Sequence, residues 1–134
     1  MTAYNEVLPR IRELAAREAL EGGGSLTREE ASALRAWTAL AAIENGGFRF
    51  FYEGEESLLA VGEALRTLGF SEAADACIQV ANAVPITDSP ADPGERDSAR
   101  NEIDWRAFDD QEDVVFSVEW DEMARAVSRL LGWS

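Results

Sequence analysis

The sequence NGGFRFFYEG at residues 45–54 decides the fold, because it crowds four aromatic side chains against glycines where a helical pattern has just ended. Gly46 and Gly47 supply backbone angles that close a helix and let the chain turn toward a core. Each aromatic ring can bury on the order of 150–250 Å², and none of the four has a reason to face solvent. They are Phe48, Phe50, Phe51 and Tyr52. We interpret the stretch as a core-forming elbow between helices, with an aromatic ligand pocket as the alternative.

Apolar residues recur at helical spacing on both sides of this elbow. Thr27 followed by Glu30 is a capping-box signature, and Pro9 is tolerable in a first helical turn. The stops are residues 22–24, Gly46 with Gly47, Gly69 and Pro85. The pattern therefore predicts helices over residues 4–20, from residue 27 to the glycine pair, over 56–68 and over 71–84.

The C-terminal third is less regular. Prolines and a glycine in and around residues 86–98 predict a long connecting loop, and residues 100–108 predict one short helix. Residues 114–118 have strand propensity, but helical spacing over 120–131 favours a C-terminal helix. We predict an all-α fold: a compact single-domain bundle of about five to six helices over residues 1–134, with an acidic loop-rich connector.

The charge is strongly one-sided, with 26 acids, 12 bases that are all arginine, no histidine and a net charge of -14. Such a chain repels nucleic acid and anionic membranes and attracts basic partners over about 8 Å at physiological salt. Without histidine most hydrolase and metalloenzyme templates are excluded, and no phosphate-binding glycine loop is present. We expect a binding protein rather than an enzyme, with no cofactor and no direct contact with nucleic acid or membrane.

The single cysteine, Cys77, lies in a helical apolar pattern, which predicts a buried, inert thiol and a reducing compartment. The first residues lack a basic region followed by an apolar core. No apolar run approaches the roughly 18 residues needed to span a bilayer. We expect a cytoplasmic protein.

The acids concentrate in residues 88–122, which contain 13 acids but only three arginines. Duplex DNA carries one charge per about 1.7 Å of its axis, so 14 net charges match roughly 24 Å of duplex. A globule of this length is about 36 Å across. One face could therefore resemble a short duplex to a basic partner. The candidate partner-binding residues are Asp97, Glu102, Asp104, Asp109, Asp110, Glu112, Asp113, Glu119, Asp121 and Glu122.

Two other interpretations of these acids remain open. An acid-rich, lysine-free composition also suits the ordinary solvated surface of a protein from a salt-tolerant or GC-rich organism. Residues 109–113 offer oxygen ligands for a hard cation, but they lack the alternating acids and turn glycine of a calcium loop. We assign no metal site.

The elbow, together with residues 64–70 (ALRTLGF) and the Ala-rich helix that follows, resembles the DNA mimic protein 19-like family over about residues 30–132. The matching positions are Asn45, Gly46, Gly47, Phe48, Phe51, Tyr52 and Gly69. Phe50 stands where the family usually has glutamine, and Gly54 lies near its asparagine. The resemblance implies a mainly structural role for these motif residues. It also implies an acidic surface that imitates the phosphates of DNA.

The resemblance and the charge together predict a protein that occupies the basic surface of a DNA-binding protein and blocks access to DNA. The alternative is an immunity or antitoxin-like inhibitor of a basic toxin or nuclease. A third possibility is a helical domain that binds a small molecule in a cavity beside Phe48 and Phe50. Should the chain form a homodimer, Trp105 and Trp133 are the candidates for its interface.

Overall fold

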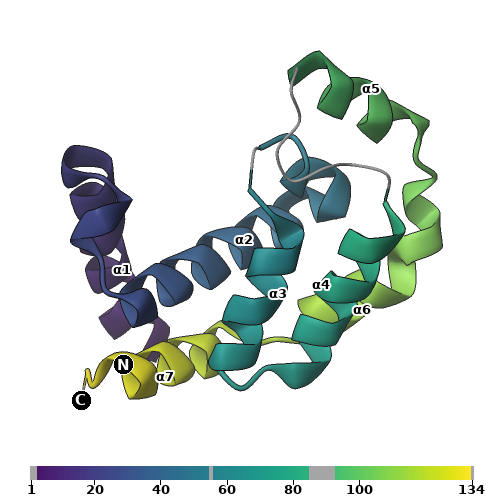
Figure 1. Cartoon of the computed structure of the whole chain (residues 1–134). Helices are drawn as coiled ribbons and strands as arrows, with labels where there is room; N and C mark the ends of the chain where they lie inside the picture. Colours follow the sequence, from purple (N-terminus) through teal and green to yellow (C-terminus); the bar gives the residue numbers. More distant parts are fainter. Residues whose placement is uncertain (1–2, 55, 85–92, 134) are drawn as a thin grey trace.

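The computed structural model describes residues 3–54, 56–84 and 93–133, with the side chains of 23 and 93–97 left undescribed. These residues form seven α-helices and two short 3-10 helices (Figure 1). The order is α1 Ala3–Glu21, η1 Gly23–Ser25, α2 Arg28–Phe51, α3 Leu58–Thr67, α4 Ser71–Ala83, α5 Pro93–Glu102, η2 Trp105–Phe108, α6 Asp109–Phe116 and α7 Trp120–Leu131. The all-α prediction is confirmed, with slightly more helices than predicted and no strand in the described ranges.

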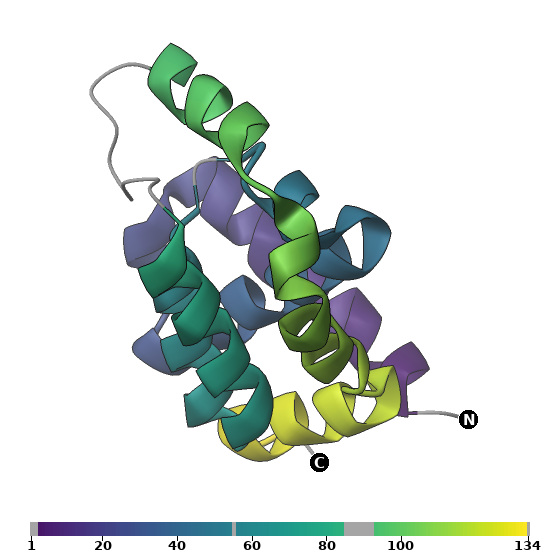
Figure 2. The same cartoon turned by 90° about the vertical axis from the view of Figure 1, so that its right-hand side faces the viewer.

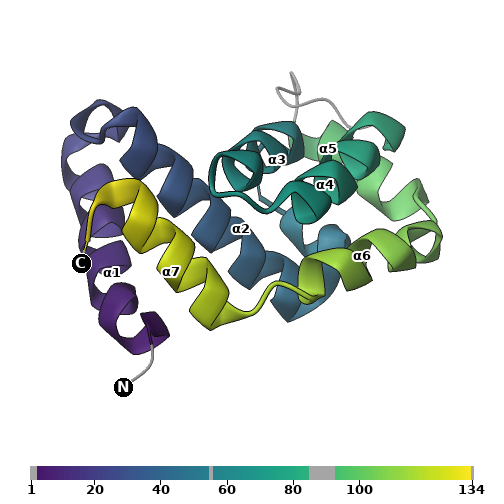
Figure 3. The same cartoon turned by 90° about the horizontal axis from the view of Figure 1, so that it is seen from below.

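Helix α2 is the central element, and α1, α3, α6 and α7 all pack against it. Figures 1 and 3 show α1 at one end of the molecule and α6 near the other, with α7 running beside α1 and α2. Helix α3 packs on α2 and forms an antiparallel pair with α4, and α6 packs on both α4 and α2. Helix α5 projects beyond this body (Figure 2).

The core is built from the apolar stripes that the sequence places at helical spacing. Ile43, Phe48, Leu58 and Met123 are fully buried and come from α2, α3 and α7. Cys77 is buried among them, and burial raises the pKa of its thiol to about 12. The prediction of a buried thiol is confirmed.

An aromatic cluster attaches α1 to the rest of the molecule. Tyr4 stacks on Trp37 with ring centroids 5.6 Å apart, and Trp120 meets both rings. The guanidinium of Arg10 lies 4.9 Å from the ring centroid of Trp133, a cation–π contact between α1 and the C-terminus. Trp133, one of our candidates for a dimer interface, therefore has a contact within its own chain.

Three local predictions are wrong, and each has a physical reason. Pro9 lies inside α1 rather than in its first turn, because α1 begins at Ala3. Residues 93–98 are helical rather than loop, since Pro93 is the first residue of α5, where its fixed φ suits a helix. Residues 100–108 do not form one helix, because α5 ends at Glu102 and η2 begins at Trp105. The rest of the predicted connector lies outside the described residues.

The segment 114–118, which has strand propensity, is mainly helical. Residues 114–116 close α6, and its buried Val115 faces the core. Tertiary packing of an amphipathic turn thus outweighs the strand propensity of its β-branched side chains.

The start of α2 is fixed by the predicted capping box. The N–H of Glu30 donates to the Thr27 hydroxyl at 3.1 Å, and the N–H of Thr27 donates to the Glu30 carboxylate at 3.0 Å. Arg17 of α1 adds an ion pair to Glu30 at 2.7 Å. The hydrogen bond from the Thr27 backbone, and then Arg17, hold the pKa of Glu30 below its ordinary value of 4.5.

Changing Glu30 to alanine is expected to lower the free energy of unfolding by about 1–2 kcal/mol at pH 7, because both contacts are lost. Glu30→Gln is the matched control, since glutamine keeps the capping hydrogen bond. The contribution of the ionised carboxylate is complete above pH 4.5 and falls as the pH drops through the lowered folded-state pKa. Urea unfolding at pH 7 and at a pH below the lowered folded-state pKa measures this contribution. Equal stability of the wild type and both variants at pH 7 would contradict this account.

Candidate partner-binding surface

The glycine pair of the elbow breaks α2 without ending it. Gly46 has φ -155° and Gly47 has φ 74°, and the helical turn resumes at Phe48. A φ of 74° lies in the left-handed region that glycine adopts without steric cost. The predicted stop is therefore a kink followed by one more turn, which carries the aromatic residues.

Glu112 of α6 caps the turn that follows the kink. The N–H of Phe48 donates to Glu112 Oε1 at 2.9 Å, across 64 residues of sequence. A carboxylate at the N-terminus of a helical turn satisfies a free N–H and meets the positive end of the dipole. A side chain at Gly47 would collide with this same carboxylate. Glu112, one of the predicted partner-binding acids, is half-buried and has a structural contact.

Three of the four elbow aromatics are buried, and the fourth is not. Phe48, Phe51 and Tyr52 are at most 5% exposed, as predicted. Tyr52 lies 5.7 Å from Trp105 between ring centroids, so the elbow also holds η2 in place. Phe50 is 40% exposed, and our prediction that it is buried is wrong.

The other two family-motif positions are Asn45 and Gly69, and the second candidate for a dimer interface is Trp105. Asn45 is exposed, and Gly69, with φ 93°, closes α3. Trp105, the other candidate for a dimer interface, donates from Nε1 to the Arg100 carbonyl at 3.0 Å. It also lies near Phe108, so it too makes contacts within its own chain.

Some of the predicted acids have contacts within the chain, and others are exposed. Asp121 is half-buried and accepts from the N–H of Tyr4 at 3.1 Å, which turns it toward α1. Asp104 is exposed and caps η2 through Arg106 N–H at 3.2 Å. The side chain of Asp97 lies outside the described residues. The other exposed members are Glu102, Asp109, Asp110, Asp113, Glu119 and Glu122.

Helices α4 and α6 bring a subset of acids together. Glu72 and Asp75 of α4 line one shallow groove with Asp110 of α6. Glu72 also lines a neighbouring groove with Glu122 of α7. On α6, Asp110 and Asp113 are separated by three residues, which sets them about 5–6 Å apart. We call Glu72, Asp75, Asp109, Asp110, Asp113 and Glu122 the α4–α6 acidic surface.

Glu72 and Asp75 were not among the predicted residues. Together with Gln79 they recur at intervals of three and four, so the polar stripe of α4 is visible in the sequence. That α4 packs beside α6 is a tertiary fact, which no local pattern contains. Arg66 pairs with Asp75 at 2.7 Å, in an exposed contact that is screened by water. The surface therefore keeps most of its negative charge.

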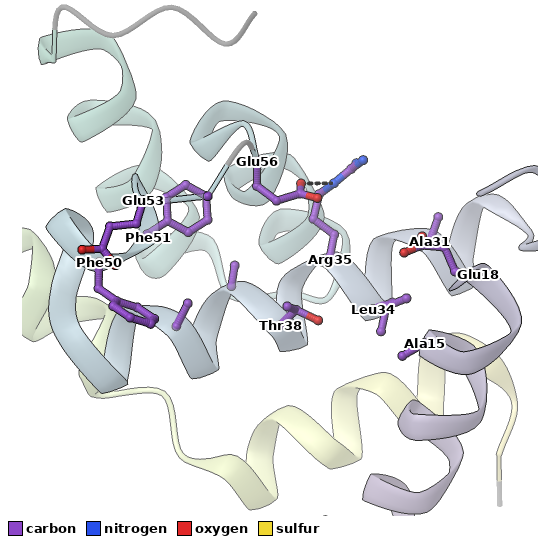
Figure 4. Close-up of a pocket in the computed structure, with 13 residues that line it drawn as sticks. Ala15, Glu18, Ala31, Leu34, Arg35, Thr38, Phe50, Phe51, Glu53 and Glu56 are labelled. Atoms are coloured by element: carbon purple, nitrogen blue, oxygen red, sulfur yellow. Dashed lines mark ion pairs between the residues drawn. The ribbon is translucent and has the colours of Figure 1, made fainter. Parts of the chain in front are cut away.

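A third depression runs along α2. It has a volume of about 580 Å³ and lies between α1, α2 and residues 53, 54 and 56 (Figure 4). Phe50 and Phe51 line it, whereas Phe48 is buried in the core. A buried cavity beside Phe48 and Phe50 would have favoured a domain that binds a small molecule. This groove is open, and it lies beside Phe50 but not beside Phe48.

The described residues contain neither a cluster of metal ligands nor a membrane-spanning helix. Among residues 3–54, 56–84 and 93–133, no three acidic or cysteine side chains are grouped so that they could hold a metal ion. None of the helices in these ranges is long and apolar enough to cross a bilayer.

Comparison with known proteins gives one positive finding. A family model described as DMP19-like protein matches residues 24–132, which includes α2 to α7 and the elbow. Neither the curated proteins nor the solved structures give a match.

Proposed function

The chain belongs to the DMP19-like protein family, and we propose that it binds the basic surface of a DNA-binding protein and blocks access to DNA. The observation that carries the proposal is the α4–α6 acidic surface. Its carboxylates come from three helices, and Arg66 is the one arginine paired with it among the described ion pairs.

The surface suits a ligand that carries several positive charges. Asp109 and Asp113 lie one helical turn apart on α6, and both are exposed. Across the groove, Glu72 extends the charge onto α4. Spaced carboxylates can accept paired hydrogen bonds from the guanidinium groups that otherwise hold phosphates. The net charge of -14 would also accelerate the encounter with a basic protein.

The mechanism is competition for one binding surface. The partner's arginines and lysines would bind either phosphates or these carboxylates, so occupation by one excludes the other. Because the contacts are between exposed charges, the affinity should fall as salt is raised. No chemical step is involved, and the proposal is a binding function rather than an enzymatic one.

A pull-down from host lysate tests the proposal. Bound proteins are recovered at about 50 mM salt, released at about 500 mM and identified by mass spectrometry, with and without added duplex DNA. Recovery of a basic DNA-binding protein that duplex DNA displaces would support it. A basic toxin or nuclease that stays bound in excess DNA would favour the immunity-type alternative. Absence of any salt-released basic protein would reject both.

A further inference from the structure

The groove along α2 has an apolar floor. Leu34, Ala39 and Phe51 form buried parts of its lining, and Ala31 and Ala42 are half-buried. Figure 4 shows the lining side chains spread along α2, with Phe50 and Phe51 at one end and Ala15 of α1 at the other. The small side chains keep the floor low along three turns of α2.

The exposed Phe50 side chain occupies space that the first glycine of the elbow leaves free. Gly46 has φ -155° and ψ 16°, a combination outside the main regions that residues with a Cβ adopt. A Cβ there would lie 2.5 Å from Phe50 Cβ and 2.9 Å from Phe50 Cγ. Gly46 therefore leaves room for the Phe50 side chain at the end of the groove. A ring that is 40% exposed there offers apolar area to an occupant.

The rim of the groove carries excess negative charge. Arg35 and Glu56 form an exposed pair at 3.6 Å near the middle. Glu18 lies toward the α1 end and Glu53 toward the Phe50 end (Figure 4). Neither of these two makes an ion pair with another described residue. An occupant with an apolar middle and positive ends would complement this pattern.

The dimensions fit a row of side chains rather than a whole chain segment. Residues 31–42 of α2 span roughly 17 Å at 1.5 Å per residue. A volume of about 580 Å³ over that length gives a cross-section of roughly 35 Å², well below that of a helix about 10 Å wide. The groove thus accepts the apolar stripe of a helix lying on it. We propose that it binds a short amphipathic helix of a partner protein, with basic residues flanking its apolar stripe.

This site is separate from the α4–α6 acidic surface. No described residue that lines the groove also lines either groove of the α4–α6 acidic surface. One wall of the groove, α1, also lies outside the residues that the family model matches. A second copy of the chain is a poor occupant because two molecules of net charge -14 repel each other. The inference therefore stands whether or not the acidic surface binds a DNA-binding protein.

The test uses a fluorescent designed peptide of about 14 residues, with leucines at helical spacing and arginines near both ends. Its affinity for the whole chain is measured by fluorescence anisotropy. A peptide of the same composition with its leucines spread around the helix is the control ligand. We expect the striped peptide to bind at least about tenfold more tightly, the equivalent of about 1.4 kcal/mol.

Two variants assign the binding to the groove. Thr38→Trp fills it from an exposed position and should weaken the striped peptide at least about tenfold, as should Phe50→Ala, which removes one end wall. Asp110→Asn with Asp113→Asn alters the other surface and should change the affinity by less than about threefold. Circular dichroism checks that each variant is folded. Equal binding of the two peptides, or binding untouched by both groove variants, would overturn the inference. So would a monomer–dimer equilibrium that Thr38→Trp abolishes, because the occupant would then be a second copy.

Discussion

A variant carrying Glu72→Gln, Asp110→Asn and Asp113→Asn is expected to bind the basic partner about a hundredfold more weakly than the wild type at physiological salt. The three carboxylates come from α4 and α6 and are all exposed. Loss of roughly 1 kcal/mol for each charge-assisted contact amounts to about 3 kcal/mol, or a factor of about 100. Isothermal titration calorimetry with the recovered partner measures the change. The slope of affinity against salt should become shallower as well.

The matched control is a variant with the same change of net charge elsewhere. Glu6, Glu13 and Glu21 are exposed on α1, far from α6 in Figure 3. Changing all three to glutamine should cost less than about tenfold, because only long-range attraction is reduced. If the two triple variants lose affinity equally, net charge rather than this surface governs binding, and our assignment of the surface fails.

Gly47→Ala is expected to lower the free energy of unfolding by about 3 kcal/mol. The combination of φ 74° and ψ -170° is adopted almost only by glycine and costs about 1–3 kcal/mol for a residue with a Cβ. The new methyl group would also displace the Glu112 carboxylate, which leaves the Phe48 N–H without its acceptor at a cost of about 1–3 kcal/mol. Urea unfolding measures the difference. The melting temperature should fall by about 10 °C.

A neighbouring glycine and a double mutant separate these two causes. Gly54→Ala meets no close contact and has no positive φ, so it should change stability by less than about 0.5 kcal/mol. Glu112→Ala alone should cost about 1–3 kcal/mol, and the double variant should cost less than the sum of the two. Strict additivity would show that the glycine and the carboxylate act independently, contrary to the structure.

The fold was predictable where one local pattern decided it. The capping box of Thr27 and Glu30 marks the start of α2 in the sequence and in the structure. Gly69 likewise closes α3 where predicted. These signals depend on the backbone and on residues three or four positions apart, so the sequence alone contains them. The burial of Cys77 could likewise be predicted from the sequence, because the residue lies in a helical apolar pattern.

The candidate site was harder to predict because its parts are distant in sequence. In the sequence, Glu112 is one acid in a dense acidic run. The fold places it beside Phe48, which is 64 residues away. Phe50 follows the same aromatic pattern as Phe48, yet the kink turns it outward while its neighbours enter the core. Composition predicts how much charge a chain carries, whereas packing decides which carboxylates are free to meet a partner.

The account's central claim is that carboxylates of the α4–α6 acidic surface replace DNA phosphates on a basic partner. The most direct test binds the recovered partner to a fluorescent duplex and adds this protein while fluorescence anisotropy reports the bound duplex. The account predicts complete release of the duplex by the wild type and by the α1 control, and little release by the variant altered at Glu72, Asp110 and Asp113. A stable complex of all three components, or equal release by that variant, would contradict it.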